Sequence, residues 1–100
     1  MIDIDPKYLD EVRRILSEHF PDAEVRVFGS RVTGNARRFS DIDIALVEPE
    51  RIDPRRIEEL KDALSESDIP YRVDVLDWNA VSESFRRVIG EDYEVLSYQV

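Results

Sequence analysis

The sequence predicts a small α/β (α+β) domain, in which a mixed β-sheet of three to four strands carries helices packed on one face. Two long segments have apolar residues at helical spacing, residues 6–20 and 54–64. Three short segments have the length and the β-branched content of strands, residues 25–28, 42–47 and 71–76. Because the two kinds of segment alternate along the chain, we expect one domain spanning residues 1–100.

Composition excludes several classes of protein. The formal net charge of −9 argues against general binding of DNA or RNA, although it leaves room for a small nucleotide in a local basic pocket. The absence of cysteine and the single histidine, His19, exclude disulfides and His- or Cys-based zinc sites. No apolar run approaches the roughly 20 residues of a membrane span, and no signal peptide opens the chain, so we expect a cytoplasmic protein without membrane contact.

The first third of the chain reads as a helix followed by a strand. Asp5 and Pro6 form a helix N-cap and first-turn pair, and apolar residues then recur at helical spacing up to Pro21. After a turn, residues 25–28 form the first strand, which ends at Gly29.

A tight corner follows that strand. Gly29 permits the turn, Ser30 can cap a short helix over residues 31–33, and Gly34 closes that helix. Backbone N–H groups at such a corner are suited to bind an anion. Gly29 and Ser30 are therefore candidate phosphate-binding residues.

Residues 26–40 carry four arginines and no acid, which is unusual in a chain this acidic: Arg26, Arg31, Arg37 and Arg38. A solvated basic face is the simple interpretation. A pocket for phosphate is the other, and it is favoured because the arginines lie directly before a pair of acids. Arg31, inside the glycine-bounded corner, is the best candidate for a phosphate contact.

Asp41 and Asp43 open the second strand, residues 42–47. Alternate residues of a strand point to the same face, so the two carboxylates lie together while Ile42 and Ile44 point into the core. Like charges on one face need a cation between them, and carboxylates are ligands that suit Mg²⁺. The alternative is a plain turn and strand edge, which does not explain an acid inside an apolar run.

The second half repeats the pattern of helix and strand. Asp53 and Pro54 again mark a helix start. In the strand over residues 71–76, Asp74 is the better candidate for a further site carboxylate, whereas Asp77 is expected to cap the next turn.

The last quarter of the chain predicts one more helix and a short tail. Trp78 is expected in the core or as a hydrophobic staple beside an Asn79 cap. A helix over residues 80–89 is expected to end at Gly90. Residues 93–100 are apolar enough for an edge strand or a docking tail.

Two motifs together carry a family resemblance: the corner GSRVTG and the strand SDIDIALV. They resemble the signature of nucleotidyltransferases related to DNA polymerase β, above all the minimal nucleotidyltransferase (MNT) proteins of HEPN/MNT toxin–antitoxin pairs. The resemblance implies a third carboxylate on a neighbouring strand, where Asp74 stands, and a third strand antiparallel to the second. It also implies metal and catalytic roles for Asp41, Asp43 and Asp74.

The function that this resemblance implies is transfer of AMP from ATP, or of NMP from another NTP, to a hydroxyl acceptor. Two Mg²⁺ ions would be held by the three aspartates, with Gly29, Ser30 and Arg31 at the phosphates. The acceptor implied by the MNT family is a tyrosine of a helical HEPN toxin, which makes the chain an antitoxin. Two alternatives stay open: an antitoxin that acts by binding alone, and a nucleotidyltransferase for a small molecule such as an aminoglycoside.

Overall fold

The structure is a computed structural model that describes residues 2–37 and 40–98, so Arg38 and the last two residues of the expected tail lie outside the described residues. The elements follow in chain order: α1 (Pro6–His19), β1 (Glu24–Phe28), α2 (Ser30–Thr33), β2 (Ile42–Val47), α3 (Pro54–Ser65), β3 (Val73–Asp77), the 3-10 turn η1 (Trp78–Ala80), α4 (Glu83–Glu91) and β4 (Tyr93–Val95). Every strand and long helix expected from the sequence is present, with shifts of a few residues at some ends.

The four strands form one mixed sheet in the order β3-β2-β1-β4. Strand β1 is antiparallel to both of its neighbours, β2 and β4. Strand β3 runs parallel to β2, so the antiparallel pairing expected from the family resemblance is wrong. The reason is the connection: α3 carries the chain back along the sheet before β3 begins, which is the crossover that parallel neighbours require.

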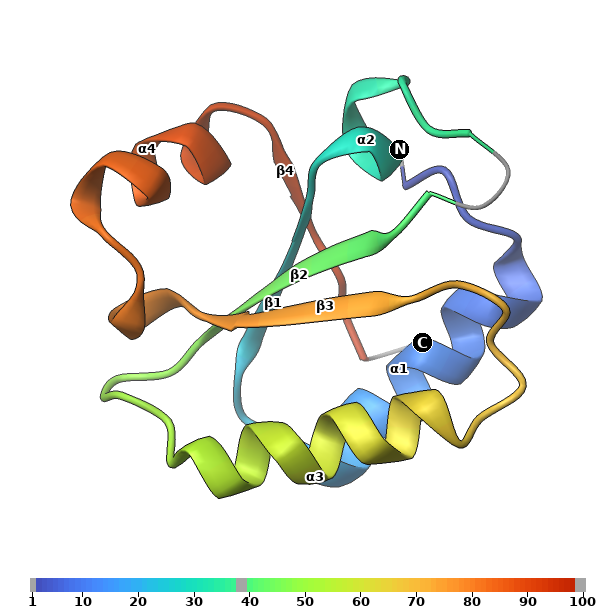
Figure 1. Ribbon diagram of the computed structural model, residues 1–100, viewed down its shortest axis with the longest axis horizontal. Coiled ribbons are helices and arrows are strands. Elements are labelled where there is room, and N and C mark those ends of the chain that lie inside the picture. The colour runs from blue at the N-terminus through green and yellow to red at the C-terminus, as the bar shows by residue number, and fades with distance from the viewer. Residues whose placement is uncertain (1, 38–39, 99–100) are drawn as a thin grey trace.

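The two long helices, α1 and α3, lie together on one face of the sheet (Figure 1). Apolar residues of both helices join the inward side chains of β1 and β2 in one buried cluster, which includes Leu16, Val27, Ile44 and Leu60. The opposite face carries the alternate strand residues, and α4 lies on that side. There Phe28 of β1 meets Phe85 of α4 edge to face, with ring centroids 6.1 Å apart.

Asp-Pro pairs start both long helices, as the sequence predicts. The Asp5 carboxylate accepts a hydrogen bond from the Lys7 N–H at 3.0 Å, and the Asp53 carboxylate accepts one from the Arg55 N–H at 2.9 Å. Each bond satisfies an N–H group that the first helical turn leaves unpaired.

The bounds expected for the last helix are wrong. Its N-cap is Ser82, whose hydroxyl accepts a bond from the Phe85 N–H at 3.2 Å, and it continues through Gly90 to Glu91. Gly90 does not end the helix because its φ is not positive, unlike that of Gly34 after α2. The following β4 is the edge strand expected from the tail. In the described part of the chain no helix is long and apolar enough to cross a membrane.

Candidate active site

Pairing of the strands places two aspartates side by side on the face opposite α1 and α3. In the sheet register, Asp43 of β2 stands between Phe28 of β1 and Asp74 of β3. Directly opposed residues of neighbouring strands point to the same face. Two of the three predicted carboxylates, far apart along the chain, are therefore neighbours in space.

Gly29 forms a close wall beside Asp43. Its φ of +79° and ψ of −156° lie in a region that only glycine adopts readily. A Cβ built on Gly29 would overlap the Asp43 Oδ2 and lie 3.3 Å from the Asp43 Cγ. The corner after β1 therefore requires glycine at position 29 for two reasons. Its backbone conformation is strained for other residues, and the Asp43 carboxylate occupies the space that a Cβ would need.

The environment of Asp43 opposes its ionisation. Burial is the largest cause of the raised pKa of the Asp43 carboxyl, followed by the negative charges of Asp74 and then of Asp41. The last two causes indicate that Asp74 and Asp41 are each close enough to repel Asp43. A bound cation would remove that penalty.

Solvent reaches the acids. Asp41 is exposed at the start of β2, and the side chain of Asp74 is 37% exposed. The Arg72 Nε lies 3.1 Å from the Asp74 Oδ1, and the Arg72 side chain is itself 76% exposed. The carboxylates are thus not sealed into buried arginine pairs.

The donor set fits Mg²⁺, because carboxylate oxygens are hard ligands and the wall formed by Gly29 carries no side chain that would crowd Asp43. Within residues 2–37 and 40–98, no group of three or more His, Cys, Asp or Glu side chains stands gathered as a ready metal cage. The predicted metal ligation by Asp41, Asp43 and Asp74 stays a prediction.

Ser30 lies one position further into α2 than the sequence predicted. Gly29 is the N-cap, its carbonyl accepts bonds from the Val32 and Thr33 N–H groups at 3.0 and 3.1 Å, and Gly34 closes the helix with φ +87°. The Ser30 side chain makes no capping bond. No hydrogen bond within the described residues uses its hydroxyl, which is therefore available to a ligand beside Asp43.

Arg31 is buried, with 4% of its surface exposed, and its guanidinium binds backbone carbonyls. The Nε and Nη2 atoms donate to the Ser40 carbonyl at 3.2 and 2.8 Å, and Nη1 donates to the Asp3 carbonyl at 3.0 Å. The guanidinium also lies 4.4 Å from the centre of the Tyr71 ring. These contacts give Arg31 a structural role, holding the loop that leads into Asp41, and its predicted phosphate contact remains untested.

Arg26, from the same basic stretch, is committed to contacts other than the aspartates. Arg26 lies between the rings of Trp78 and Tyr93, 4.7 Å from each centre, and pairs with Glu24 at 2.6 Å. Arg37 is exposed. Trp78, expected in the core or as a staple, is only half-buried, and its ring lies against the Arg26 guanidinium.

Asp77 has the capping role expected for it. Its carboxylate is buried and accepts bonds from the Asn79 N–H at 3.0 Å and the Ile52 N–H at 2.8 Å. It fixes the turn after β3 and the entry to α3, so it belongs to the scaffold and not to the acidic site.

Arg72 was missed as a site residue. The signal was available, because Arg72 precedes Asp74 by two positions in a strand and therefore shares its face.

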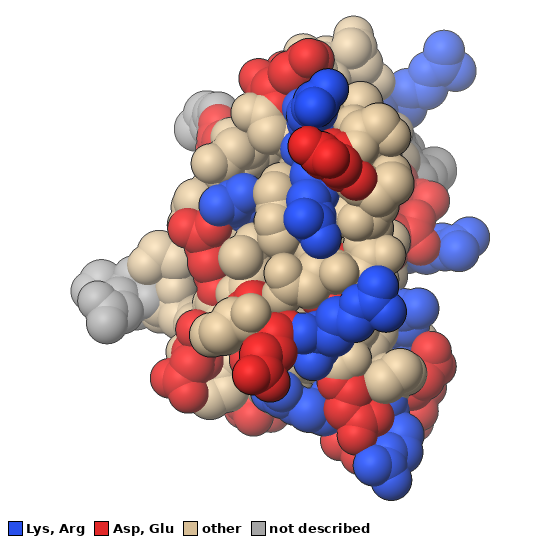
Figure 2. Space-filling view, turned by 90° about the vertical axis from the view of Figure 1, so that its left-hand side faces the viewer, with Lys and Arg blue, Asp and Glu red and all other residues tan. Residues whose placement is uncertain are grey.

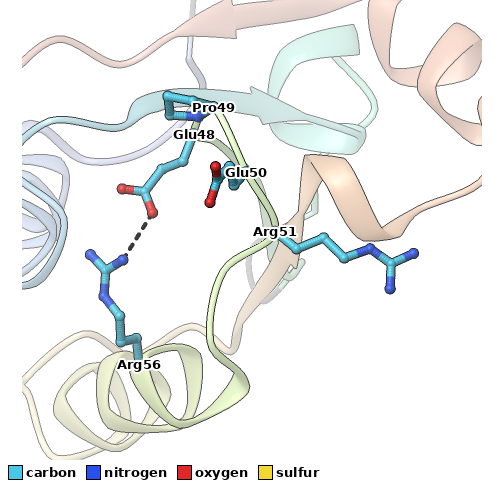
Figure 3. A pocket seen from close by; sticks show the side chains of 5 residues that line it. All are labelled: Glu48, Pro49, Glu50, Arg51 and Arg56. Atoms are coloured by element: carbon cyan, nitrogen blue, oxygen red, sulfur yellow. Dashed lines mark hydrogen bonds and ion pairs between the residues drawn. The ribbon is translucent and has the colours of Figure 1, made fainter.

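A polar hollow of about 270 Å³ lies at the other end of β2, lined by Glu48, Pro49, Glu50, Arg51 and Arg56 (Figure 3). Glu48 pairs with Arg56 across it at 3.0 Å, while the Arg51 side chain points away. The hollow lies where β2 ends, whereas Asp41 lies just before β2 begins. The hollow is therefore separate from the three aspartates of the candidate site. On the face drawn in Figure 2, basic and acidic side chains are interspersed, which does not suit a nucleic-acid backbone.

Known proteins resemble this chain in sequence. A family model described as polymerase beta, nucleotidyltransferase, matches residues 10–99. A protein of Haemophilus influenzae named probable protein adenylyltransferase MntA is 45% identical over 95 residues, which cover 95% of this chain and 83% of the relative.

Solved structures give the same result for the fold. A chain from a toxin–antitoxin crystal structure with AMP-PNP superposes with a TM-score of 0.76 at 26% identity, over 89% of this chain and 72% of that one. A chain from the complex of a tri-AMPylated Shewanella oneidensis HEPN toxin with its MNT antitoxin gives a TM-score of 0.68 at 22% identity, over 91% and 71% of the two chains. At that identity the second likeness shows the fold alone.

Proposed function

Because the chain belongs to the polymerase β-type nucleotidyltransferase family, we propose that it transfers AMP from ATP to a hydroxyl group of a partner protein. The observation that carries this proposal is the pairing of Asp43 with Asp74 in the sheet register, next to the side-chain-free wall of Gly29. That arrangement gives a partly exposed acidic site beside a corner suited to phosphate.

Asp41, Asp43 and Asp74 would hold Mg²⁺ in this proposal. When bound, the metal supplies positive charge to the triphosphate and lowers the pKa of the attacking hydroxyl. The raised pKa of the Asp43 carboxyl supports a cation site here, because burial and the charges of Asp74 and Asp41 oppose its ionisation and a bound cation would offset them.

The glycine corner would bind the phosphoryl end of ATP. Ser30 offers a hydroxyl that no described protein group uses, and the backbone of such a glycine corner suits an anion. Arg31 would act from behind, holding the loop between Gly34 and Asp41 through its bonds to the Ser40 carbonyl. Its contribution to the reaction is therefore positioning rather than direct contact.

The proposed reaction exchanges one phosphorus–oxygen bond for another. The acceptor hydroxyl oxygen bonds to the α-phosphorus of ATP while the bond from that phosphorus to the pyrophosphate oxygen breaks. The hydroxyl proton passes to the Asp74 carboxylate, which solvent reaches, and from there to water. The products are an AMP ester of the acceptor and pyrophosphate.

The acceptor that the relatives favour is a tyrosine of a HEPN-type toxin. The MntA relative is named a protein adenylyltransferase, and the solved relatives are toxin–antitoxin complexes, one with an AMPylated HEPN toxin. Adenylylation of a toxin would make this chain an antitoxin. Since ATP is the donor, the proposed reaction belongs to the cytoplasm.

The test is AMP transfer to the cognate HEPN-type protein. The wild-type chain, mixed with that partner, Mg²⁺ and radioactive ATP, is expected to label the partner, and mass spectrometry is expected to find AMP on tyrosine. Asp43→Asn and Asp74→Asn should abolish labelling, because each removes a carboxylate of the site. Asp62→Asn, an exposed acid on α3, is the matched control and should label normally.

Three results would contradict the proposal in different ways. Labelling by the Asp43→Asn, Asp74→Asn double variant would show that the acids are not the site. Neutralisation of the partner by that variant, at wild-type strength, would favour the antitoxin that acts by binding alone. Labelling of an aminoglycoside in the absence of any protein partner would favour the small-molecule enzyme.

A further inference from the structure

Arg72 is the cation that the described structure places against the acidic site. Its Nε lies 3.1 Å from the Asp74 Oδ1, and its backbone carbonyl accepts the Ile42 N–H at 2.9 Å. The second bond continues the parallel ladder of β2 and β3 by one step, so position 72 stands beside position 41. Asp41, Asp43, Arg72 and Asp74 thus form two neighbouring pairs across the two strands.

Two other arginines near the corner, Arg26 and Arg31, are committed to structural contacts. Arg31 is buried on backbone carbonyls, and Arg26 lies between two aromatic rings. Arg72 differs because its side chain is 76% exposed. In the described part of the chain it makes no hydrogen bond or ion pair through its side chain other than that with Asp74. An exposed single ion pair is weak, so Arg72 can leave Asp74 at little cost.

Resting on the function proposed above, we propose that Arg72 is a built-in counter-ion that competes with the metal for Asp74. In the nucleotide-free chain its guanidinium partly neutralises the three carboxylates and occupies the approach to the third one. Negative phosphate brought in by ATP then offers the guanidinium another partner, and Asp74 becomes free for metal. The site would in this way bind metal more tightly with nucleotide than without it.

The test measures Mn²⁺ binding to the nucleotide-free chain by electron paramagnetic resonance at low ionic strength. Arg72→Gln is expected to bind Mn²⁺ about three- to tenfold more tightly than wild type, because an exposed charge pair contributes up to about fivefold and the metal carries two charges. Arg72→Lys keeps the charge and should stay near wild type. Arg87→Gln removes another exposed arginine, whose partner is Glu83 on α4, and should change nothing.

Salt separates electrostatic competition from a structural effect. If Arg72 acts through its charge, the difference between wild type and Arg72→Gln should shrink as potassium chloride rises from low concentration to about 0.5 M. A purely structural role would leave the difference unchanged, and that result would overturn the proposal.

Equal or weaker Mn²⁺ binding by Arg72→Gln would also overturn it, the weaker case showing that Arg72 holds Asp74 in place for the metal. So would the absence of measurable binding by every variant. These outcomes are distinct from failure of the proposed function, which is judged by AMP transfer by the wild-type chain. A wild type that transfers AMP while Arg72→Gln gains no affinity refutes the counter-ion alone.

Discussion

Replacement of Gly29 by alanine tests the corner of the site most sharply. Gly29 has φ +79° and ψ −156°, and a Cβ there would overlap the Asp43 carboxylate. The substitution therefore strains the backbone and displaces one of the proposed metal ligands at once. We expect loss of stability and loss of AMP transfer together.

The size of the effect follows from the two causes. A side chain in this glycine-only region costs about 1–3 kcal/mol, and forcing an extra carbon into an occupied space costs about 1–3 kcal/mol more. The Asp43 side chain is half-buried and can give way in part, so about 3 kcal/mol in total is a fair expectation. For a domain of this size that corresponds to a fall of roughly 12–24 °C in Tm.

The other two glycines of the chain serve as controls. Gly34 also has positive φ, +87°, but a Cβ built there meets nothing within 4 Å. Gly34→Ala should therefore cost only the backbone strain, about 1–2 kcal/mol. Gly90 is helical and its surroundings are open, so Gly90→Ala should stabilise the chain by about 0.5–1 kcal/mol.

The assay is thermal and urea unfolding of the three variants beside wild type, with AMP transfer measured well below each Tm. The expected order of stability is Gly90→Ala, wild type, Gly34→Ala and then Gly29→Ala. If Gly29→Ala were no less stable than Gly34→Ala, the close approach of Gly29 to Asp43 would be wrong. Full AMP transfer by folded Gly29→Ala would refute the role of that corner.

Substitutions at five further positions test other parts of the structure. Folding raises the pKa of the Asp43 carboxyl. The stability that protonation of Asp43 contributes is therefore present at low pH and is lost as pH rises through the pKa of the folded state. In urea unfolding, the stability advantage of Asp43→Asn over wild type should grow with pH. Asp77→Ala leaves two backbone N–H groups without their acceptor and should cost about 2–3 kcal/mol in urea unfolding, whereas Asp74→Asn should leave stability near wild type and abolish transfer. Arg31→Ala should cost about 3 kcal/mol in the same measurement, and Arg31→Lys should recover less than half of it, because one ammonium cannot reproduce the guanidinium's bonds to two carbonyls. The Tyr98 hydroxyl is buried without a hydrogen-bond partner in the described structure. Burial, with the charge of Glu48, raises the pKa of Tyr98 to about 12. Because Tyr98→Phe removes this unsatisfied hydroxyl, it should stabilise the chain by about 1 kcal/mol in thermal unfolding.

Features set by neighbouring residues were predictable from the sequence. The pairs Asp5-Pro6 and Asp53-Pro54 mark the starts of α1 and α3, because the cap and the proline act within one helical turn. Alternation along β2 likewise predicts that Asp43 lies on the face away from Ile42 and Ile44, because it is also a local property of the strand.

Features set by distant parts of the chain were not. The parallel pairing of β3 with β2 depends on how α3 crosses the sheet, and no local pattern at residues 71–76 records it. The burial of Arg31 depends on carbonyls at Asp3 and Ser40, which only the folded chain brings to it. The basic stretch in the sequence thus does not reveal that the Arg31 guanidinium binds backbone carbonyls.

The most direct test of the account is the position of Mn²⁺ in a crystal of this chain with a non-hydrolysable ATP analogue, located by anomalous scattering. The account predicts metal between the carboxylates of Asp41 and Asp43, within ligand distance of Asp74, with the triphosphate against Gly29 and Ser30. Manganese elsewhere, or an Asp74 still paired with Arg72 while nucleotide and metal are bound, would contradict it.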